Sequence, residues 1–595
     1  MNKKTSMSYF DLLAWIVENK NELEGCRIDN IYRISGTLAY FFKLHCKNGD
    51  KNLVIEPGKR IHFTKYDRQK EISNEITVIR AHLKDRIINY VEILGKERIL
   101  KIYVGDKRIY IELLPRGLLI ITDENNRILF STEYKEFKDR IIKPNTEYRP
   151  PPSPPAPTGE EIEKLIKKGN IARIIGAPQE IIEALGIKVN NKEELKNAIE
   201  KVNELEKKIT EGIFDRCLIP GISVLPIKTD SCIEEPTYND ALDEYFTNEE
   251  RNLAKNEINK KLEDEKKKLL KTIEEVKEEI KKYEEEEKKY RNIANLLITN
   301  YDWIEEEIRK NLEKGQIKVN INGIEIEIDP KLSVYKNSSK YFDLAKEFSE
   351  KAKKAKETLL SLEKKLQELD KQIEEKSEEI KMSLRKREWY EKYRWSFTRN
   401  GFLVIAGRDI DQNESLVRKM LNEKDIFLHA DIQGAAVTIL KTEGKIPSED
   451  DIKDAAIIAA CYSKAWKANI GAIDVFWVYG EQVSKSPPSG EYLNKGSFMI
   501  YGKKNFIKNV KLQLAIGITE DFKVIIGSED IVRKYSKLDI YFVVEPGEED
   551  PSKLSQKITK ILQEKLKVKG LKILQDDIAK SLPGKSRIVS IKNKT

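Results

Sequence analysis

The chain has 595 residues with 108 Lys+Arg and 100 Asp+Glu, so more than a third of it is charged while its net charge is only +8. A chain of this length usually divides into several domains, each with its own core. No stretch approaches the ~20 uncharged apolar residues of a membrane crossing, and the N-terminal segment lacks the small-residue cleavage site of a secretion signal. We therefore expect a cytoplasmic protein with no membrane partner.

Residues 1–148 are predicted to form a mixed α/β domain. Apolar spacing predicts helices over Asp11–Leu23 and Glu75–Leu83. The proline-rich residues 149–157 cannot form a helix or a central strand, so we predict an extended linker there. Short β-prone runs predict the strands of the domain: Ala39–Cys46, Leu53–Ile55, Ile99–Val104, Ile109–Leu114, Leu118–Thr122 and Arg127–Ser131.

Residues 158–248 are predicted to be a helical and connecting region. Thr158–Lys188 has the pattern of two or three short helices joined at Ile174-Ile-Gly-Ala-Pro. This arrangement resembles a helix-hairpin-helix, in which backbone amides at a helix N-terminus meet a phosphate. The closely spaced glycines usual in such a turn are missing, and plain helical packing is the alternative.

Residues 249–386 are predicted to fold as an antiparallel coiled-coil hairpin. Apolar residues recur at alternating spacings of four and three in two arms, 249–300 and 341–386, which is typical of heptads. A rise of ~1.5 Å per residue gives an apolar seam of about 50 Å. Between the arms, Asn322-Gly323 within Gln316–Ile328 predicts a β-hairpin at the tip. We interpret the Lys and Glu runs as the solvated face of the coiled coil.

The remaining residues predict a second α/β domain at 387–510 and a small α/β unit with a basic tail at 511–595. The second domain holds four of the six tryptophans. In the last segment we expect a helix near Lys553–Lys567 and strands at Leu512–Ile518, Phe522–Ile526 and Leu538–Val544. The fold class predicted for the whole chain is multidomain α/β plus α.

The net positive charge is concentrated at the N-terminal end. Residues 1–150 contain 28 Lys+Arg and 21 Asp+Glu, whereas the coiled coil is nearly balanced. Because neutralising phosphates gives affinity without regard to sequence, a basic domain and a second globular domain on a long spacer suggest two contacts with one nucleic acid. The alternative is the ordinary surface lysine of a protein adapted to a hot habitat.

The usual catalytic motifs are absent from the sequence. It has four histidines, no HxxxH or CxxC pair, no phosphate-binding GxxxxGK[ST] loop and no dinucleotide-binding glycine pattern, so we predict no metal, no cofactor and no enzyme activity. The five cysteines are odd in number and unpaired by spacing, which indicates reduced thiols in a reducing compartment. They are Cys26, Cys46, Cys217, Cys232 and Cys461.

Aromatic and cationic residues alternate in the second α/β domain. Trp389–Trp395 reads WYEKYRW, and Gly401–Arg408 leads into an acidic turn. Such residues stack single-stranded bases while holding phosphates. The alternative is core tryptophans beside surface charges, but several clusters within about 120 residues favour a nucleic-acid surface.

The motifs, taken in order, resemble those of the NFACT family in its archaeal RqcH branch, which is related to NEMF. The resemblance spans residues 1–510, and its longest motifs lie between residues 387 and 510. The motifs are FDLLAWIVEN, IRAHL, WYEKYRWSFTRNGFLVIAGRDIDQNESLVRK, DIFLHADIQGAAV, ACYSKAW and VSKSPPSGEYLNKGSFMIYGKKN.

This resemblance implies a ribosome-associated quality-control factor. Such a protein binds the large ribosomal subunit obstructed by peptidyl-tRNA, recruits alanyl-tRNA and promotes untemplated alanine tailing of the nascent chain. The ribosome itself forms the peptide bonds, so no catalytic residue and no small-molecule substrate are expected, in agreement with the missing catalytic motifs.

The resemblance also implies particular tRNA-binding residues in the first domain. The family's early aspartate matches Asp11, and its later Asp-Arg pair falls at Glu97-Arg98, where the carboxylate is one methylene longer. Asp85-Arg86 has the literal dipeptide but lies too early in the pattern. Arg98 would grip a phosphate or a base edge while the carboxylate orients it; the alternative is a salt bridge within the domain.

Further RNA-binding candidates lie in both α/β domains. In the first domain they are Arg80 and His82 of the IRAHL motif. In the second domain they are Trp389, Arg394, Arg408, Asp409, His429, Asp431, Lys485, Lys503 and Lys504.

Two other classes of protein remain as alternatives. The N-terminal domain with a helix-hairpin-helix distantly resembles formamidopyrimidine-type DNA glycosylases, but their N-terminal proline nucleophile is missing from Met1-Asn2. A surface adhesin is the third class, since relatives have been described as fibronectin-binding, and the missing signal peptide argues against it.

Overall fold

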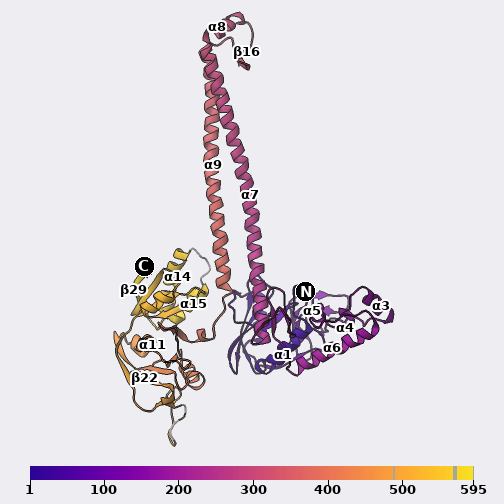
Figure 1. The fold of residues 1–595 in the computed structure, drawn as a ribbon, viewed down its shortest axis with the longest axis vertical. Helices are drawn as coiled ribbons and strands as arrows, with labels where there is room; N and C mark the ends of the chain where they lie inside the picture. The colour runs from indigo at the N-terminus through magenta and orange to yellow at the C-terminus, as the bar shows by residue number, and fades with distance from the viewer. Residues whose placement is uncertain (485, 487–488, 567–571, 594–595) are drawn as a thin grey trace. The chain divides into compact units, whose positions relative to one another are not determined.

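The computed structural model describes residues 1–484, 486, 489–566 and 572–593. It has the predicted fold class, in which α/β parts with antiparallel sheets accompany long helices (Figure 1). The chain divides into two compact units, Met1–Asn252 with Ile380–Thr595, and Leu253–Glu379. Within the described residues, no helix is both long enough and apolar enough to cross a membrane.

The N-terminal residues form two antiparallel sheets together with α1 (Tyr9–Leu23) and α2 (Asn74–Leu83), which confirm the two predicted helices. The strand orders are β4-β3-β2-β1-β5 and β10-β9-β8-β7-β6, and one core joins both sheets to α1. The strands of the first sheet are β1 Arg27–Ile34, β2 Tyr40–Cys46, β3 Gly49–Glu56, β4 Arg60–Phe63 and β5 Lys70–Glu71. Those of the second are β6 Ile88–Ile93, β7 Ile99–Val104, β8 Lys107–Glu112, β9 Leu119–Asp123 and β10 Ile128–Ser131, and the short pair β11 Lys135–Glu136 and β12 Ile141–Ile142 follows.

The sequence pattern does not reveal strand β1, although β1 lies inside the first sheet. Its buried residues Ile28, Ile31 and Ile34 are spaced by three rather than by two. A β-bulge between Ile28 and Asn30 shifts the register against β2, and an extra residue at a bulge interrupts the alternation of side chains. The strand therefore lacks the period that sequence reasoning looks for.

Three short helices follow residues 149–158, which contain neither helix nor strand. They are α3 (Gly159–Lys167), α4 (Ala172–Ile175) and α5 (Gln179–Ala184), as the pattern predicted. Their isoleucines pack with α6 (Lys192–Thr210) into the N-terminal core, so plain packing is present here. The strands β13 (Cys217–Ile219), β14 (Ser223–Leu225) and β15 (Ile233–Glu234) form a small sheet after them.

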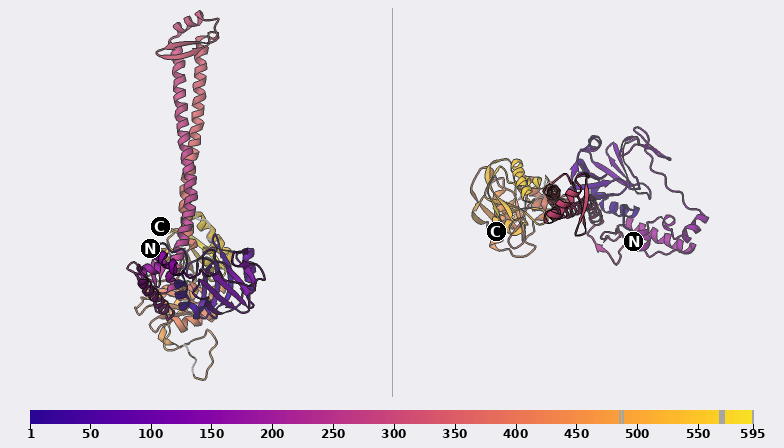
Figure 2. Two further views of the ribbon diagram at one scale, coloured as in Figure 1. Left: turned by 90° about the vertical axis from the view of Figure 1, so that its right-hand side faces the viewer. Right: turned by 90° about the horizontal axis from the view of Figure 1, so that it is seen from above.

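The predicted helical hairpin is present. The helices α7 (Tyr238–Thr299) and α9 (Val334–Ser383) run side by side, as Figure 1 and Figure 2 show from different directions. Lys266, which interrupts the apolar seam, donates a hydrogen bond from Nζ to Asp370 Oδ1 at 2.8 Å. The tip carries α8 (Tyr301–Lys310) and the predicted β-hairpin, in which β16 (Ile317–Ile321) pairs with β17 (Ile324–Ile328).

The described C-terminal residues form a six-stranded sheet of order β18-β19-β21-β20-β22-β25, a four-stranded sheet of order β27-β26-β28-β29 and the short pair β23-β24. One hydrophobic core contains residues from both of the larger sheets, so the segments on either side of residue 510 pack as one body. The expected polar tail is wrong in part, because Ser586–Asn593 forms β29 and pairs with β28. The elements are β18 Arg394–Phe397, β19 Leu403–Ala406, α10 Ile410–Ser415, β20 Ile426–Ala430, β21 Thr438–Lys441, α11 Glu449–Cys461, α12 Lys464–Lys467, β22 Ala472–Tyr479, β23 Val483–Ser484, β24 Met499–Ile500, β25 Asn505–Lys511, β26 Leu514–Ile518, β27 Val524–Gly527, α13 Glu529–Tyr535, β28 Ile540–Glu549, α14 Pro551–Leu566, α15 Lys572–Ser581 and β29 Ser586–Asn593.

The prediction of reduced, unpaired cysteines is wrong for four of the five. Cys26 is disulfide-bonded to Cys46, and Cys217 to Cys232. The sequence separations of 20 and 15 residues carry no hint of this pairing, but antiparallel strand register does. Arg27 pairs with His45, so the neighbouring cysteines lie with their Cα atoms 4.3 Å apart, within the reach of a disulfide. Cys461 is free and buried, and burial raises the pKa of its thiol.

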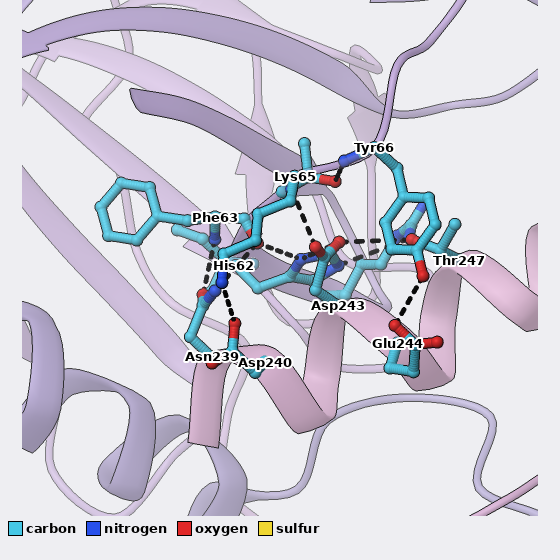
Figure 3. Close-up of polar contacts among 12 residues, drawn as sticks. His62, Phe63, Lys65, Tyr66, Asn239, Asp240, Asp243, Glu244 and Thr247 are labelled. Atoms are coloured by element: carbon cyan, nitrogen blue, oxygen red, sulfur yellow. Dashed lines mark hydrogen bonds and ion pairs between the residues drawn. The ribbon is translucent and has the colours of Figure 1, made fainter. Parts of the chain in front are cut away.

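A buried polar network holds the first turns of α7 against β4 and the residues that follow it (Figure 3). Asn239 Oδ1 accepts a hydrogen bond from the Phe63 backbone N–H at 2.7 Å. Asp243 Oδ2 accepts one from the Lys65 N–H at 2.9 Å, and the Tyr66 hydroxyl donates to Glu244 at 2.6 Å. The base of α7 is therefore fixed by Asn239 and Asp243, whose side chains accept hydrogen bonds from backbone N–H groups next to the sheet.

Two fully buried arginines extend this network one turn further along α7. Arg60 Nη2 and Arg68 Nε both donate to Glu250 Oε2, at 2.9 and 3.1 Å. Arg68 Nη2 also donates to Thr247 Oγ1 at 2.8 Å. These two cations share the Glu250 carboxylate, whose pKa is lowered: burial alone would raise it, but the two guanidinium groups outweigh burial.

Candidate nucleic-acid interface

Asp11 lies in a buried ionic cluster at the start of α1. It is the third residue of the helix and forms a capping box with Ser8: the Ser8 N–H donates to Asp11 Oδ2 at 2.8 Å, and the Asp11 N–H donates to Ser8 Oγ at 3.1 Å. The Lys4 ammonium donates to the Asp11 carboxylate and to Glu180, and the Tyr238 hydroxyl donates to Asp11 as well. The side chain of Asp11 is therefore enclosed and does not face solvent.

The two carboxylates of this cluster stabilise the charged form of Lys4. Burial works against the Lys4 ammonium, but the charges of Asp11 and Glu180 outweigh it and raise its pKa. Burial raises the pKa of Glu180, although Lys4 opposes the shift. Burial and the Asp11 charge raise the pKa of the Tyr238 hydroxyl well above its usual value. Lys4, Glu180 and Tyr238 were not predicted as site residues. Glu180 and Tyr238 lie far from Asp11 in the sequence, and Lys4 belongs to no motif.

Arg98 reaches the same N-terminal segment from the start of β7. Its Nη1 donates to Ser6 Oγ at 3.2 Å and to the Met7 carbonyl at 3.4 Å. Within the described part of the chain it makes no ion pair, so the salt bridge considered as an alternative is not formed. Burial lowers the pKa of the guanidinium, and Asp11 and Glu97 oppose this shift by their charge. Glu97 Oε1 accepts a hydrogen bond from Ser153 of the proline-rich segment at 2.5 Å.

Arg80 and His82 lie on α2, which packs against β1 in the same core as α1. Arg80 Nε donates to the Ile31 carbonyl at 2.8 Å, and its guanidinium lies over the Tyr32 ring at 4.8 Å from the centroid. His82 is half-buried; burial lowers its pKa, and Lys107 adds to this effect. Arg80 therefore packs against the sheet with one side, and its Nη2 is buried without a partner among the described residues.

In the C-terminal part, Arg394, Arg408 and Asp409 line one pocket of about 370 Å³. Arg394 lies over the Tyr462 ring at 4.4 Å from the centroid and donates to the Gly407 carbonyl at 3.1 Å. Arg408 donates to the Tyr393 carbonyl at 3.4 Å. Asp409 caps α10 by accepting from the Gln412 N–H at 2.8 Å. The structure therefore brings together three candidates that the sequence identifies separately.

The other candidates of this domain lie around strands β20, β22 and β25. His429 stacks between Phe427 and Phe476, and burial lowers its pKa. Lys504 lies over the Phe476 ring at 4.4 Å, next to the half-exposed Phe506. The remaining positions are exposed: Asp431, Lys503 and Trp389. Lys485 falls outside the described residues.

The positions of the candidate residues define a class of protein. Cations and aromatic rings are grouped on both α/β parts, which is the pattern of a multidomain RNA-binding protein. Residues 8–392 match the family model described as NFACT N-terminal and middle domains, and residues 392–502 match that of the NFACT protein RNA binding domain. The chain belongs to the NFACT family, as the motifs predicted.

Relatives with known roles agree with this assignment. The archaeal Rqc2 homolog aRqcH of Methanocaldococcus jannaschii is 28% identical, over 98% of this chain and 98% of that protein. The ribosome quality control complex subunit NEMF homolog of Drosophila melanogaster is 26% identical over 87% of this chain and 66% of its own length. These names support the coarse function inferred from the sequence, an RNA-binding ribosome quality control factor.

A fibrinogen binding protein from Staphylococcus aureus of known structure covers 40% of this chain and 99% of its own at 19% identity. Its TM-score is 0.33, and a likeness of this size carries no argument about fold or function.

Proposed function

We propose that this protein binds the large ribosomal subunit obstructed by peptidyl-tRNA, recruits alanyl-tRNA and promotes untemplated C-terminal alanine tailing of the stalled nascent chain. One observation carries the proposal: the chain aligns over nearly its full length with an archaeal relative named as an Rqc2 homolog. The ribosome would form the peptide bonds, so the protein needs to hold and orient RNA rather than react with it.

Arg98 and Glu97 are the residues that we assign to tRNA. Arg98 is fixed by Ser6 and Met7 and makes no ion pair with a described residue, so its charge is available to a phosphate or a base edge. Asp11 is enclosed and is therefore a positioning residue: it holds the segment from Lys4 to Ser8, against which Arg98 rests. Arg98 and Glu97 would therefore contact tRNA and Asp11 would position Arg98, although all three are motif residues.

The proposed function predicts which RNA accompanies the protein. When the protein is recovered from a gentle lysate and its bound RNA is sequenced, we expect large-subunit RNA together with enrichment of alanine tRNA. A matched recovery at high salt should lose the RNA, because phosphate contacts weaken steeply as salt rises. Recovery of duplex DNA, or of no RNA at all, would overturn the proposal.

The assignment of Arg98 predicts a loss of tailing. In Glu97→Ala/Arg98→Ala we expect at least about a tenfold lower rate of tailing in a reconstituted extract, because one lost charge-assisted contact costs about 1.5–3 kcal/mol. Asp85→Ala/Arg86→Ala is the matched control, since Arg86 pairs with Asp106 at an exposed position. Unchanged tailing in the first variant, or equal loss in both, would show that this pair does not bind tRNA.

A further inference from the structure

The pocket between Arg394 and Arg408 contains two cations that no carboxylate neutralises. Neither guanidinium makes an ion pair with a described residue, and the Nε atom of each is buried without a hydrogen-bond partner. Burial lowers the pKa of both groups. The acidic groups nearby are already engaged: Asp409 caps α10, and Asp577 pairs with Arg385 and Arg387.

Arg394 and Arg408 are half-buried, and so are Arg80 and Arg98, which likewise make no ion pair with a described residue; Arg394 and Arg408 differ from these in lining one pocket together. The fully buried arginines of the described chain each have a carboxylate partner. The pairs are Arg60 with Glu56 at 2.9 Å, Arg68 with Glu250 at 3.1 Å, Arg140 with Glu112 at 2.6 Å and Arg385 with Glu391 at 2.8 Å.

A half-buried cation without an ion-pair partner is unfavourable, since it has lost part of its hydration without gaining an opposite charge. Two such cations beside one pocket indicate that an anion completes the site. The carbonyl contacts of Arg394 and Arg408 hold the two guanidinium groups in place, so the cost of ordering them has already been met before a ligand binds.

Two lysines add positive charge at the same pocket. Lys464 and Lys467 line it, are exposed and form no ion pair with a described residue. The Lys464 side chain lies directly on Gly434, whose φ is +77°: a Cβ atom at this position would come within 2.3 Å of Lys464 Cε. The positive φ favours glycine at this position, and the missing Cβ leaves room for the Lys464 side chain against the loop.

The rest of the lining is mixed: Asp409, Asn413, Tyr462 and Ser463 are polar, and another part is apolar. Ala435, Ala436 and Pro583 line the pocket together with Ile410, which is 57% exposed. A volume of about 370 Å³ lies within the range of small-ligand sites. Charge on part of the lining and apolar surface on another part match a nucleotide, whose phosphate is anionic and whose ribose and base have apolar faces.

We propose that this pocket receives a single nucleotide of an RNA strand, with its phosphate between Arg394 and Arg408 and its ribose and base against Ile410 and Ala435. The inference deepens the proposed RNA-binding function and rests on it. It assigns to the two arginines a direct phosphate contact, and to Lys464 a supporting charge at the mouth of the pocket.

The test measures binding of fluorescein-labelled hexauridylate to the full chain by fluorescence anisotropy at several salt concentrations. For Arg394→Gln/Arg408→Gln we expect at least about a tenfold weaker affinity and a log–log salt slope smaller by about 1. Arg587→Gln, an exposed arginine of β29 paired with Glu545, is the control and should bind as the wild type does. The melting temperature of the double variant should be unchanged or higher, because it removes two unneutralised half-buried charges.

A competition experiment distinguishes a phosphate within an RNA strand from a free mononucleotide or inorganic phosphate. Uridine monophosphate and inorganic phosphate should displace the labelled RNA from the wild type only at millimolar concentration, as expected for a site that binds one phosphate within a strand. Equal hexauridylate affinity in the double variant and the wild type would overturn the inference, as would tight binding of the mononucleotide that hexauridylate does not displace.

The outcome is separable from that of the proposed function. If wild-type protein recovers tRNA and large-subunit RNA from lysate while the double variant still binds hexauridylate normally, the pocket assignment fails and the function stands. If the double variant loses hexauridylate while no ribosomal RNA is recovered with the wild type, the pocket stands and the ribosomal role fails.

Discussion

Glu250→Gln should lower the free energy of unfolding by about 3–5 kcal/mol, since removing one member of a buried ion pair leaves its partner charged and without compensation. Arg68 bears most of the effect, because Glu250 is its one ion-pair partner among the described residues, whereas Arg60 retains Glu56. Differential scanning calorimetry of the full chain should show the first transition shifted down by about 10 °C.

The matched control for this change is Glu257→Gln, which removes an exposed glutamate from the same helix and should leave the transition within about 1 °C. Arg68→Met provides the second test. Combined with Glu250→Gln, it should cost less than the sum of the two single changes, since it removes the cation that Glu250 neutralises. Additive effects, or a Glu250→Gln transition like that of the control, would mean that the network at the base of α7 contributes little stability.

Lys4→Met should destabilise the N-terminal part of the chain by about 3–5 kcal/mol and strongly reduce tailing. Without the Lys4 ammonium, Asp11 and Glu180 are two buried carboxylates that no cation separates. The segment that carries Ser6 and Met7 would then lose its anchor, and with it the support of Arg98. Lys47→Met is the matched control, because Lys47 is an exposed lysine of the same N-terminal part that makes no ion pair with a described residue.

The destabilisation by Lys4→Met should depend on pH in a defined direction. Burial already raises the pKa of Glu180, and loss of Lys4 removes the charge that opposes this shift. A carboxyl group whose pKa is higher in the folded chain than in the unfolded chain binds more protons when folded, so the fold gains stability as the pH falls. The deficit against the wild type should therefore be smaller near pH ~5 than near pH ~8. An equal deficit at pH ~5 and pH ~8, or a Lys47→Met variant with the same pH dependence, would contradict the role of Lys4.

The candidate site could be predicted only in part. Arg394, Arg408 and Asp409 were identified from motifs and do line one pocket. Asp11 was identified as a motif residue, but its enclosure depends in part on Tyr238, a contact across 227 residues that has no sequence signal. Strand β1 was missed because its bulge hides the alternation that marks a strand.

The sequence by itself determined those features that repeat locally along the chain. The heptads of α7 and α9 and the hairpin at Asn322-Gly323 follow from spacings of a few residues, since helix and strand periods act over such distances. The long family motifs likewise identified the class of protein.

Only the tertiary structure decided which distant residues meet. It paired Cys26 with Cys46 through strand register and made Glu250 the shared partner of two buried arginines. It gave Arg394 and Arg408 no carboxylate partner among the described residues. The physical reason is that charge compensation and burial depend on the three-dimensional distance between groups, and a residue's position along the chain does not determine that distance.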